Sequence, residues 1–415
     1  MKLDFLQDRR WQLALVLMVT FFVGFMDRIN ITFALPLMAE EYGWTEGETR
    51  RYGSLLMGLF YGAYGLANIL LSPIAARFGP RRSLLTIVCL WSLFTAMGAW
   101  VSQWLMLLLA SRVLLGLSEG VHVPMMTTAT KTWFPLEERA RANSIIVAGI
   151  FLAVLLAPLM LVPMMANFGW RSGFLVLAAG GLLVSLPLIY RFVYDRPEEH
   201  PDISEAEKNH VNEGREREAT DEVSGQLLRD LFRTPRFLLF FVIGIFNNLM
   251  SIGVSSWLPT YFTNKRGIPY EDITFLVAAP YAFSIVGVAL WSTLGDRFNI
   301  RSLLAGVGFG LAGVVIYVAL NTESLPLVIV CMTAAVFLFS AFTASEFALI
   351  QRILPMDRFA AAMGFYNGMT ALVGGGLGPA LMSPLIGDGS GTWIITLVAG
   401  LNAALLVVFY RMIRY

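Results

Sequence analysis

Long apolar runs alternate with short polar segments along the whole chain. About twelve runs of roughly 18 to 25 residues are each long enough, as a helix, to cross a hydrocarbon layer about 30 Å thick. They lie near 12–37, 53–75, 83–101, 104–130, 141–166, 172–193, 237–262, 272–294, 302–320, 325–350, 359–383 and 391–411. The pattern predicts an all-α membrane protein with about twelve transmembrane helices.

A single long polar stretch, residues 195–236, separates the first six runs from the last six. It is rich in charge and cannot bury an apolar core, so it is typical of a linker with short surface helices. We therefore expect an N-terminal six-helix bundle over 1–194, a cytoplasmic linker over 195–236 and a C-terminal six-helix bundle over 237–415.

The two halves repeat a short loop at the same place. Residues 76–82, ARFGPRR, follow the second run, and residues 295–301, GDRFNIR, follow the eighth. The arginines have the same spacing in both loops, with Arg77 and Arg81 corresponding to Arg297 and Arg301. Two similar bundles that rock about a site between them are what alternating access requires. The repeat favours a transporter over a membrane receptor or enzyme.

Positive charge is concentrated on one side if the helices alternate in direction. That side holds the linker and Arg9, Arg10, Arg77, Arg81, Arg82, Arg139, Arg141, Arg297, Arg301, Arg358, Arg411 and Arg414. The opposite loops are poorer in positive charge, although 264–266 goes against the trend. The positive-inside rule predicts that both termini are cytoplasmic, and the compact loops favour a bacterial inner membrane.

Composition narrows the function classes. The chain is 57% hydrophobic and 14% charged with a net charge of +1, which is incompatible with a soluble globular protein and leaves no basic stripe for nucleic acid. Cys89 and Cys331 lie in apolar runs and are expected to be small core residues. The first run is too long for a cleavable signal and contains Asp27. We expect no metal, no cofactor and no nucleic-acid partner.

Four ionisable residues lie within the first and fourth runs: Asp27, Arg28, Arg112 and Glu119. Inserting each of these side chains into a bilayer costs roughly 2.5 to 3.5 kcal/mol, so each is expected to have a structural or functional role. Their charges cancel, and Arg112 and Glu119 share one helix face. A carboxylate in low dielectric favours its protonated form whereas a nearby arginine favours the ionised form, which suits proton coupling. The alternative is a structural ion-pair network between these helices. A guanidinium grips a carboxylate through two hydrogen bonds, so Arg28 is the candidate for a substrate carboxylate.

Three further polar residues are candidates for the substrate site. His122 follows Glu119 by three residues and is either a proton relay or a packed neutral histidine. Glu346 is either a site in the second half or an ion-pair partner of Arg352. Asn367 lies in the glycine-rich eleventh run, where an amide is expected to face a cavity because lipid would not satisfy it.

Several motifs together resemble the major facilitator superfamily over nearly the whole chain, and within it the anion:cation symporter family. They are Asp27-Arg28-Ile29-Asn30, Arg112 with Glu119-Gly120 and Pro124, Trp133-Phe134-Pro135 with residues 138–142, Phe168-Gly169-Trp170-Arg171, residues 196–201 with Ser204 and Glu207, and Trp257-Leu258-Pro259-Thr260-Tyr261. That family includes sugar-acid and phthalate permeases and sialic acid and vesicular glutamate transporters.

The resemblance implies proton-linked uptake of a small organic anion. It assigns proton coupling to Asp27 and Glu119, with Arg112 as the partner of Glu119. It assigns substrate contacts to Arg28, Tyr64 and Asn367. The loop residues Arg77, Arg81, Asp296 and Arg297 are expected to gate the conformational change.

The chain departs from the family pattern at three positions. Ala76 stands where an aspartate is usual, Ile150 where sugar-acid carriers use glutamine, and Gly62 where tryptophan is common. Fewer hydrogen-bonding groups in the pocket indicate a substrate with fewer hydroxyls than a sugar acid.

Other functions stay open. Efflux of a metabolite or drug uses the same architecture, and direction does not follow from charge. An organophosphate exchanger would be expected to carry an arginine in each half, but the seventh run has none before Lys265. A non-transporting receptor would be expected to have a long signalling tail, and an enzyme a recognisable catalytic spacing. The expected partners are a small organic anion, protons and the lipid bilayer, with the protein as a monomer.

Overall fold

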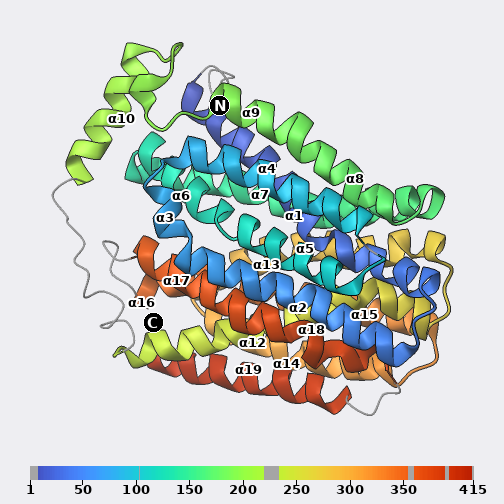
Figure 1. Ribbon diagram of the computed structural model, residues 1–415. Coiled ribbons are helices and arrows are strands. Elements are labelled where there is room, and N and C mark those ends of the chain that lie inside the picture. Colours follow the sequence, from blue (N-terminus) through green and yellow to red (C-terminus); the bar gives the residue numbers. More distant parts are fainter. Residues whose placement is uncertain (1–7, 102, 219–232, 354–358, 388–391, 414–415) are drawn as a thin grey trace. The chain divides into compact units, whose positions relative to one another are not determined.

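The computed structural model describes residues 8–101, 103–218, 233–353, 359–387 and 392–413, and within these ranges every regular element is a helix (Figure 1). By length and composition, 12 helical segments can cross a membrane. They are Arg9–Glu41, Glu46–Leu70, Pro80–Trp100, Leu105–Trp133, Glu137–Phe168, Arg171–Phe192, Pro235–Lys265, Tyr270–Phe298, Arg301–Leu320, Leu325–Ile350, Met363–Ile386 and Trp393–Ile413. The predicted number and order of spans are confirmed.

Several spans contain more than one helical element. The first six comprise α1 (Arg9–Glu41), α2 (Glu46–Leu70), α4 (Pro80–Trp100), α5 (Leu105–Glu119) with α6 (His122–Trp133), α7 (Leu136–Phe168), and α8 (Arg171–Gly180) with α9 (Leu186–Phe192). The last six comprise α12 (Pro235–Thr260), α13 (Ile273–Phe298), α14 (Arg301–Leu320), α15 (Leu325–Thr343) with α16 (Glu346–Ile353), α17 (Phe359–Thr370) with α18 (Gly376–Met382), and α19 (Thr392–Ile413). Short α3 (Ser72–Ala76) follows α2, and α10 (Glu205–Glu218) lies in the polar segment between the halves. Residues 219–232 of that segment, and Arg358 and Arg414, are outside the described ranges.

The second span begins at Glu46, seven residues before the predicted apolar run. Thr45 and Glu48 form a reciprocal cap: the Thr45 hydroxyl accepts from the Glu48 N–H at 3.3 Å, and the Glu48 carboxylate accepts from the Thr45 N–H at 2.9 Å. This capping box starts the helix in polar sequence. Hydropathy marks only the part of the helix that is apolar, so it placed the start too late.

The fourth span is interrupted between α5 and α6, directly after Glu119. Pro124 lacks the N–H that would bond to the carbonyl of Gly120, so the helix loses a hydrogen bond there. Gly120 also packs against α2: a Cβ at this position would collide with the carbonyl oxygen of Tyr64 and lie 2.8 Å from the Cβ of Ala67. The interruption and the missing side chain let α2 approach closely beside Glu119.

The tenth span is interrupted in the same manner, between α15 and α16, directly before Glu346. Here Arg301 donates to the carbonyl of Ala344 at 2.9 Å and occupies an acceptor that a continuous helix would use. The Ser345 hydroxyl bonds back to the carbonyl of Ala341 at 2.8 Å. A glutamate therefore flanks a helix break in both the fourth and the tenth span.

Internal contacts divide the chain into two compact units. The first contains the described residues within 1–30, 63–154 and 171–222, and the second those within 31–62, 155–170 and 223–415. In the second unit, α14 packs against α15 and α19, and α12 packs against α18.

In the first unit, the segment after α9 folds onto the starts of other helices. The Glu207 carboxylate accepts from the backbone N–H groups of Arg9 and Arg10 at 3.1 and 2.8 Å. The Asp195 carboxylate accepts from the N–H of Arg81 at 2.7 Å. The starts of α1 and α4 and the beginning of the polar segment therefore lie at one end of this unit.

Candidate functional site

Charged residues from the first and fourth spans meet inside the first unit. Arg28 of α1 and Glu119 of α5 form an ion pair with 3.2 Å between Nε and Oε2, and their side chains are 10% and 1% exposed. The helix break at Gly120 presents Glu119 at the end of α5. The predicted contact between the first and fourth helices is made by Arg28.

Asp27 points to a different neighbour, as expected for adjacent residues on a helix. It is fully buried, and its Oδ2 accepts a hydrogen bond from the Thr95 hydroxyl of α4. Arg112, 1% exposed on α5, interacts electrostatically with both Asp27 and Glu119. The site thus contains two carboxylates and two guanidinium groups, and its charges cancel when all are ionised.

An aromatic ring covers the Arg28 guanidinium. The guanidinium carbon lies 4.3 Å from the ring centre of Tyr64 and 5.2 Å from that of Phe25. Cation–π contact is favourable in a water-poor site, and it involves the face of the guanidinium rather than its N–H edge. Tyr64, 3% exposed, is therefore placed as a support for Arg28.

The site contains polar atoms that no side chain or backbone group satisfies in the described part of the chain. They are Asp27 Oδ1, Glu119 Oε1 and both amide atoms of Asn30, all buried. Buried polar groups without a partner are rare in native proteins and usually bind water or a ligand. The cluster therefore has unused hydrogen-bonding capacity directly beside its charges.

His122 lies at the start of α6 among aromatic rings. It is 1% exposed, and its ring centre lies 4.9 Å from that of Trp91 and 5.8 Å from that of Phe21. Within the described residues its Nε2 has no hydrogen-bond partner. These contacts are those of a packed histidine, and a relay role stays a prediction.

The second-half candidates lie in the second unit. Glu346 Oε1 accepts a hydrogen bond from the Tyr366 hydroxyl at 2.7 Å. Arg352, the ion-pair partner considered from the sequence, donates to Asn299 at 2.6 Å. Asn367 follows Tyr366 on α17 and is partly exposed.

Two of the four loop candidates, Arg81 and Asp296, have partners nearby. Arg81 donates to the carbonyl of Tyr190 at 2.8 Å and stacks 4.2 Å from the ring centre of Tyr194. Asp296 forms an ion pair with Arg301. Arg77 and Arg297 are exposed. Their gating role stays a prediction.

Sequence reasoning did not single out Thr95 or Tyr366. Each is the polar partner of a carboxylate within a span, and each carries its hydroxyl in a largely apolar run. Cys89 is exposed rather than buried, since the lipid-facing side of a membrane helix is apolar as well. Among the described residues no group of three or more His, Cys, Asp or Glu could hold a metal ion.

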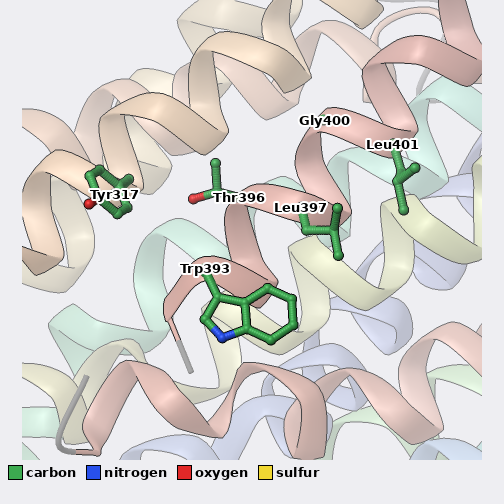
Figure 2. Close-up of a pocket in the computed structure, with 6 residues that line it drawn as sticks. All are labelled: Tyr317, Trp393, Thr396, Leu397, Gly400 and Leu401. Carbon is green, nitrogen blue, oxygen red and sulfur yellow. The ribbon is translucent and has the colours of Figure 1, made fainter. Parts of the chain in front are cut away.

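A shallow depression lies between α14 and α19 in the second unit (Figure 2). Figure 2 shows Trp393, Thr396, Leu397, Gly400 and Leu401 along one helix, with Tyr317 opposite. Its lining is almost entirely apolar and has no charged group, and Trp393 is 60% exposed. These properties fit contact with lipid chains and not the binding of an anion.

Comparisons with known proteins agree with this arrangement. The model of the Major Facilitator Superfamily matches residues 17–379 and 267–415. A probable sulfoacetate transporter of Cupriavidus necator is 29% identical over 313 residues, which are 73% of this chain and 70% of that protein. The chloroplastic ascorbate transporter of Arabidopsis thaliana is 28% identical over 72% of this chain but only 56% of its own length. The D-galactonate transporter of Escherichia coli is 24% identical over 91% of this chain and 89% of that protein.

Solved structures show the same fold. A D-xylose–proton symporter superposes with a TM-score of 0.74 at 15% identity, covering 96% of this chain and 97% of that one. A bacterial homologue of the human lysosomal transporter Spinster, inward-facing and unoccupied, superposes with a TM-score of 0.73 at 19% identity, covering 98% and 95%. The chain belongs to the major facilitator superfamily and is an integral membrane transporter, not an enzyme.

Proposed function

We propose that the protein is a secondary active transporter that carries a small organic anion together with protons by alternating access. The observation that carries this proposal is the buried ion pair between Arg28 and Glu119. Removing one partner of a buried pair leaves an uncompensated charge, which is costly in a membrane interior. The charge state of Glu119 therefore decides what Arg28 binds.

The coupling follows from charge balance. When Glu119 is ionised, it neutralises Arg28. When a proton binds Glu119, Arg28 keeps its charge and loses the neutralising charge of Glu119, and a substrate carboxylate can take the place of that charge. Loss of the anion and of the proton restores the ion pair. A carrier in which the two ligands bind together in this way is a symporter.

Asp27 and Arg112 contribute to the same charge balance. The Thr95 hydroxyl holds one oxygen of Asp27, while the other has no partner among the described residues. Arg112 interacts electrostatically with both acids, so protonation of either acid increases the net positive charge of the site. Asn30 offers both a donor and an acceptor beside these charges.

The substrate class is supported by the relatives. The three relatives described above are named as transporters of sulfoacetate, ascorbate and galactonate. Each of these three compounds is a small organic anion. Uptake into the cell across a bacterial inner membrane, with both termini cytoplasmic and the protein as a monomer, completes the proposal. In support of this topology, the positively charged starts of α1 and α4 share one end of the first unit with the polar segment.

Transport by the purified protein in proteoliposomes tests the function. Sulfoacetate, ascorbate and galactonate are offered as radiolabelled probes, with and without an inward proton gradient. We expect at least one probe to accumulate above its external concentration only with the gradient, and a protonophore to abolish accumulation. Efflux would instead be shown by a probe leaving loaded vesicles as protons enter. Movement of every probe independently of the proton gradient would refute proton coupling.

A further inference from the structure

Glu346 is a further carboxylate within the spans, and the proposed function does not use it. It begins α16 directly after the break in the tenth span. Its Oε1 accepts from the Tyr366 hydroxyl at 2.7 Å, and Tyr366 is 2% exposed on α17. The Tyr366 ring stacks on Phe240 of α12 with 5.4 Å between ring centres. The hydrogen bond therefore joins α16 to an aromatic layer formed with α12.

The Tyr366 hydroxyl is held in place by close packing. A Cβ at Gly244 of α12 would collide with the Tyr366 hydroxyl, so the helix backbone limits where this hydroxyl can move. Glu346 itself is partly exposed. One carboxylate oxygen is fixed by the Tyr366 hydroxyl, and the other, Oε2, is the candidate to bind a proton.

No ion pair neutralises Glu346 in the described part of the chain. The nearby charged groups are engaged elsewhere: Arg301 donates to the Ala344 carbonyl and pairs with Asp296, and Arg352 donates to Asn299. The α12 residues that contact Tyr366, Phe240 and Gly244, are uncharged, and Arg236, one turn before Phe240 on the same helix, is exposed. The hydrogen-bond donor to Glu346 is the neutral Tyr366 hydroxyl. A neutral donor stabilises a negative charge within a span poorly, so the protonated form of the carboxyl group is favoured.

We propose that Glu346, oriented by Tyr366, is a second proton-binding site in the tenth span. A hydronium ion transfers its proton to Oε2 and leaves as water, while Oε1 continues to accept from the Tyr366 hydroxyl. The inference goes beyond the proposed function, because binding of this proton needs no anion and does not involve Arg28 or Glu119.

The site is connected to the repeated loop of the second half. Arg301, which pairs with Asp296, also holds the Ala344 carbonyl two residues before Glu346. A change in the charge of Glu346 therefore occurs beside a helix break at which Arg301 of the loop motif binds a backbone carbonyl. Through this hydrogen bond, protonation in the tenth span can affect the position of the loop residues.

Infrared difference spectroscopy of the full chain, titrated from alkaline to acidic pH without any anion, tests the proposal. We expect a carbonyl band of protonated carboxylic acid that Glu346→Gln removes. Tyr366→Phe should shift this band to higher frequency, because the carbonyl loses its hydrogen-bond donor. Glu323→Gln, at an exposed position between α14 and α15, is the matched control and should leave the band unchanged.

Two results would overturn the proposal: a titration of Glu346→Gln identical to that of the wild type, or a band that Tyr366→Phe does not shift. Tyr366→Phe keeps the packed ring, so it remains informative if Glu346→Gln fails to fold. Because no anion is present, the outcome is independent of the uptake assay. A failure of proton-coupled uptake leaves this titration interpretable, and the reverse also holds.

Discussion

Replacing Gly120 with alanine should destabilise the protein at the place where α5 ends beside Glu119. The added Cβ would collide with the carbonyl oxygen of Tyr64 and lie 2.8 Å from the Cβ of Ala67. The carbonyl belongs to the backbone of α2, so it cannot yield by a change of rotamer. The two helices must separate instead, which moves Glu119 relative to Arg28.

The magnitude follows from the packing. Inserting a methyl group into a closely packed contact typically costs about 1 to 3 kcal/mol. Gly62 is the matched control, because it lies in α2, the helix against which Gly120 packs, and nothing lies within 4 Å of its Cβ position. Alanine is favoured over glycine within a helix by roughly 0.5 to 1 kcal/mol, so Gly62→Ala should be neutral or stabilising.

Thermal unfolding of the detergent-solubilised variants, followed by tryptophan fluorescence, measures both effects. We expect Gly120→Ala to unfold at a lower temperature than the wild type and Gly62→Ala at the same or a higher temperature. Gly120→Ala should also transport more slowly than the wild type at a temperature where both are folded. Equal stability of Gly120→Ala and the wild type would refute the close approach of α2 to the helix break.

Three further predictions concern the first unit. Glu207→Gln should lower the free energy of unfolding by roughly 0.5 to 2 kcal/mol, because the carboxylate caps the start of α1, whereas Glu205→Gln, 80% exposed, should change little in the same unfolding assay. Thr95→Val should cost roughly 1.5 to 3 kcal/mol, because Asp27 loses a hydrogen bond, and Thr95→Ser should restore the wild-type unfolding temperature. The pKa of His200 is lowered from 6.5, chiefly by burial, so its folded form binds protons less readily than its unfolded form. Stability should therefore fall as pH drops below about 6.5 towards the lower folded value, and His200→Asn should flatten this part of the pH profile.

The membrane architecture was predictable because hydropathy reports directly on it. Each apolar run is long enough to span the bilayer, and nothing else in the sequence competes with that signal. The errors lie where polar residues form helix, as at the Thr45–Glu48 cap that starts α2 early. The breaks beside Glu119 and Glu346 were also missed, because Pro124 lies after its break and Arg301 acts from another helix.

The candidate site was predictable in its charges but not in its contacts. Ionisable residues in apolar runs are conspicuous, and helical spacing placed Arg112 and Glu119 on one face. The sequence could not decide whether Arg28 or Asp27 meets the fourth span, because that depends on the rotation of α1 against its neighbours. Thr95 became visible only as a partner, since a threonine hydroxyl in an apolar helix usually bonds to its own backbone. Tyr366 became visible only as a partner because Glu346 lies on a different helix.

Counterflow and accumulation, measured side by side for Glu119→Gln, test the central claim most directly. Glutamine mimics the protonated glutamate, so the variant should bind the anion but should no longer couple its movement to protons. We predict that vesicles carrying this variant exchange labelled for unlabelled anion yet fail to accumulate it under an inward proton gradient, while Glu40→Gln, at an exposed position at the end of α1, accumulates as the wild type does. Accumulation by Glu119→Gln at the wild-type level would contradict the account.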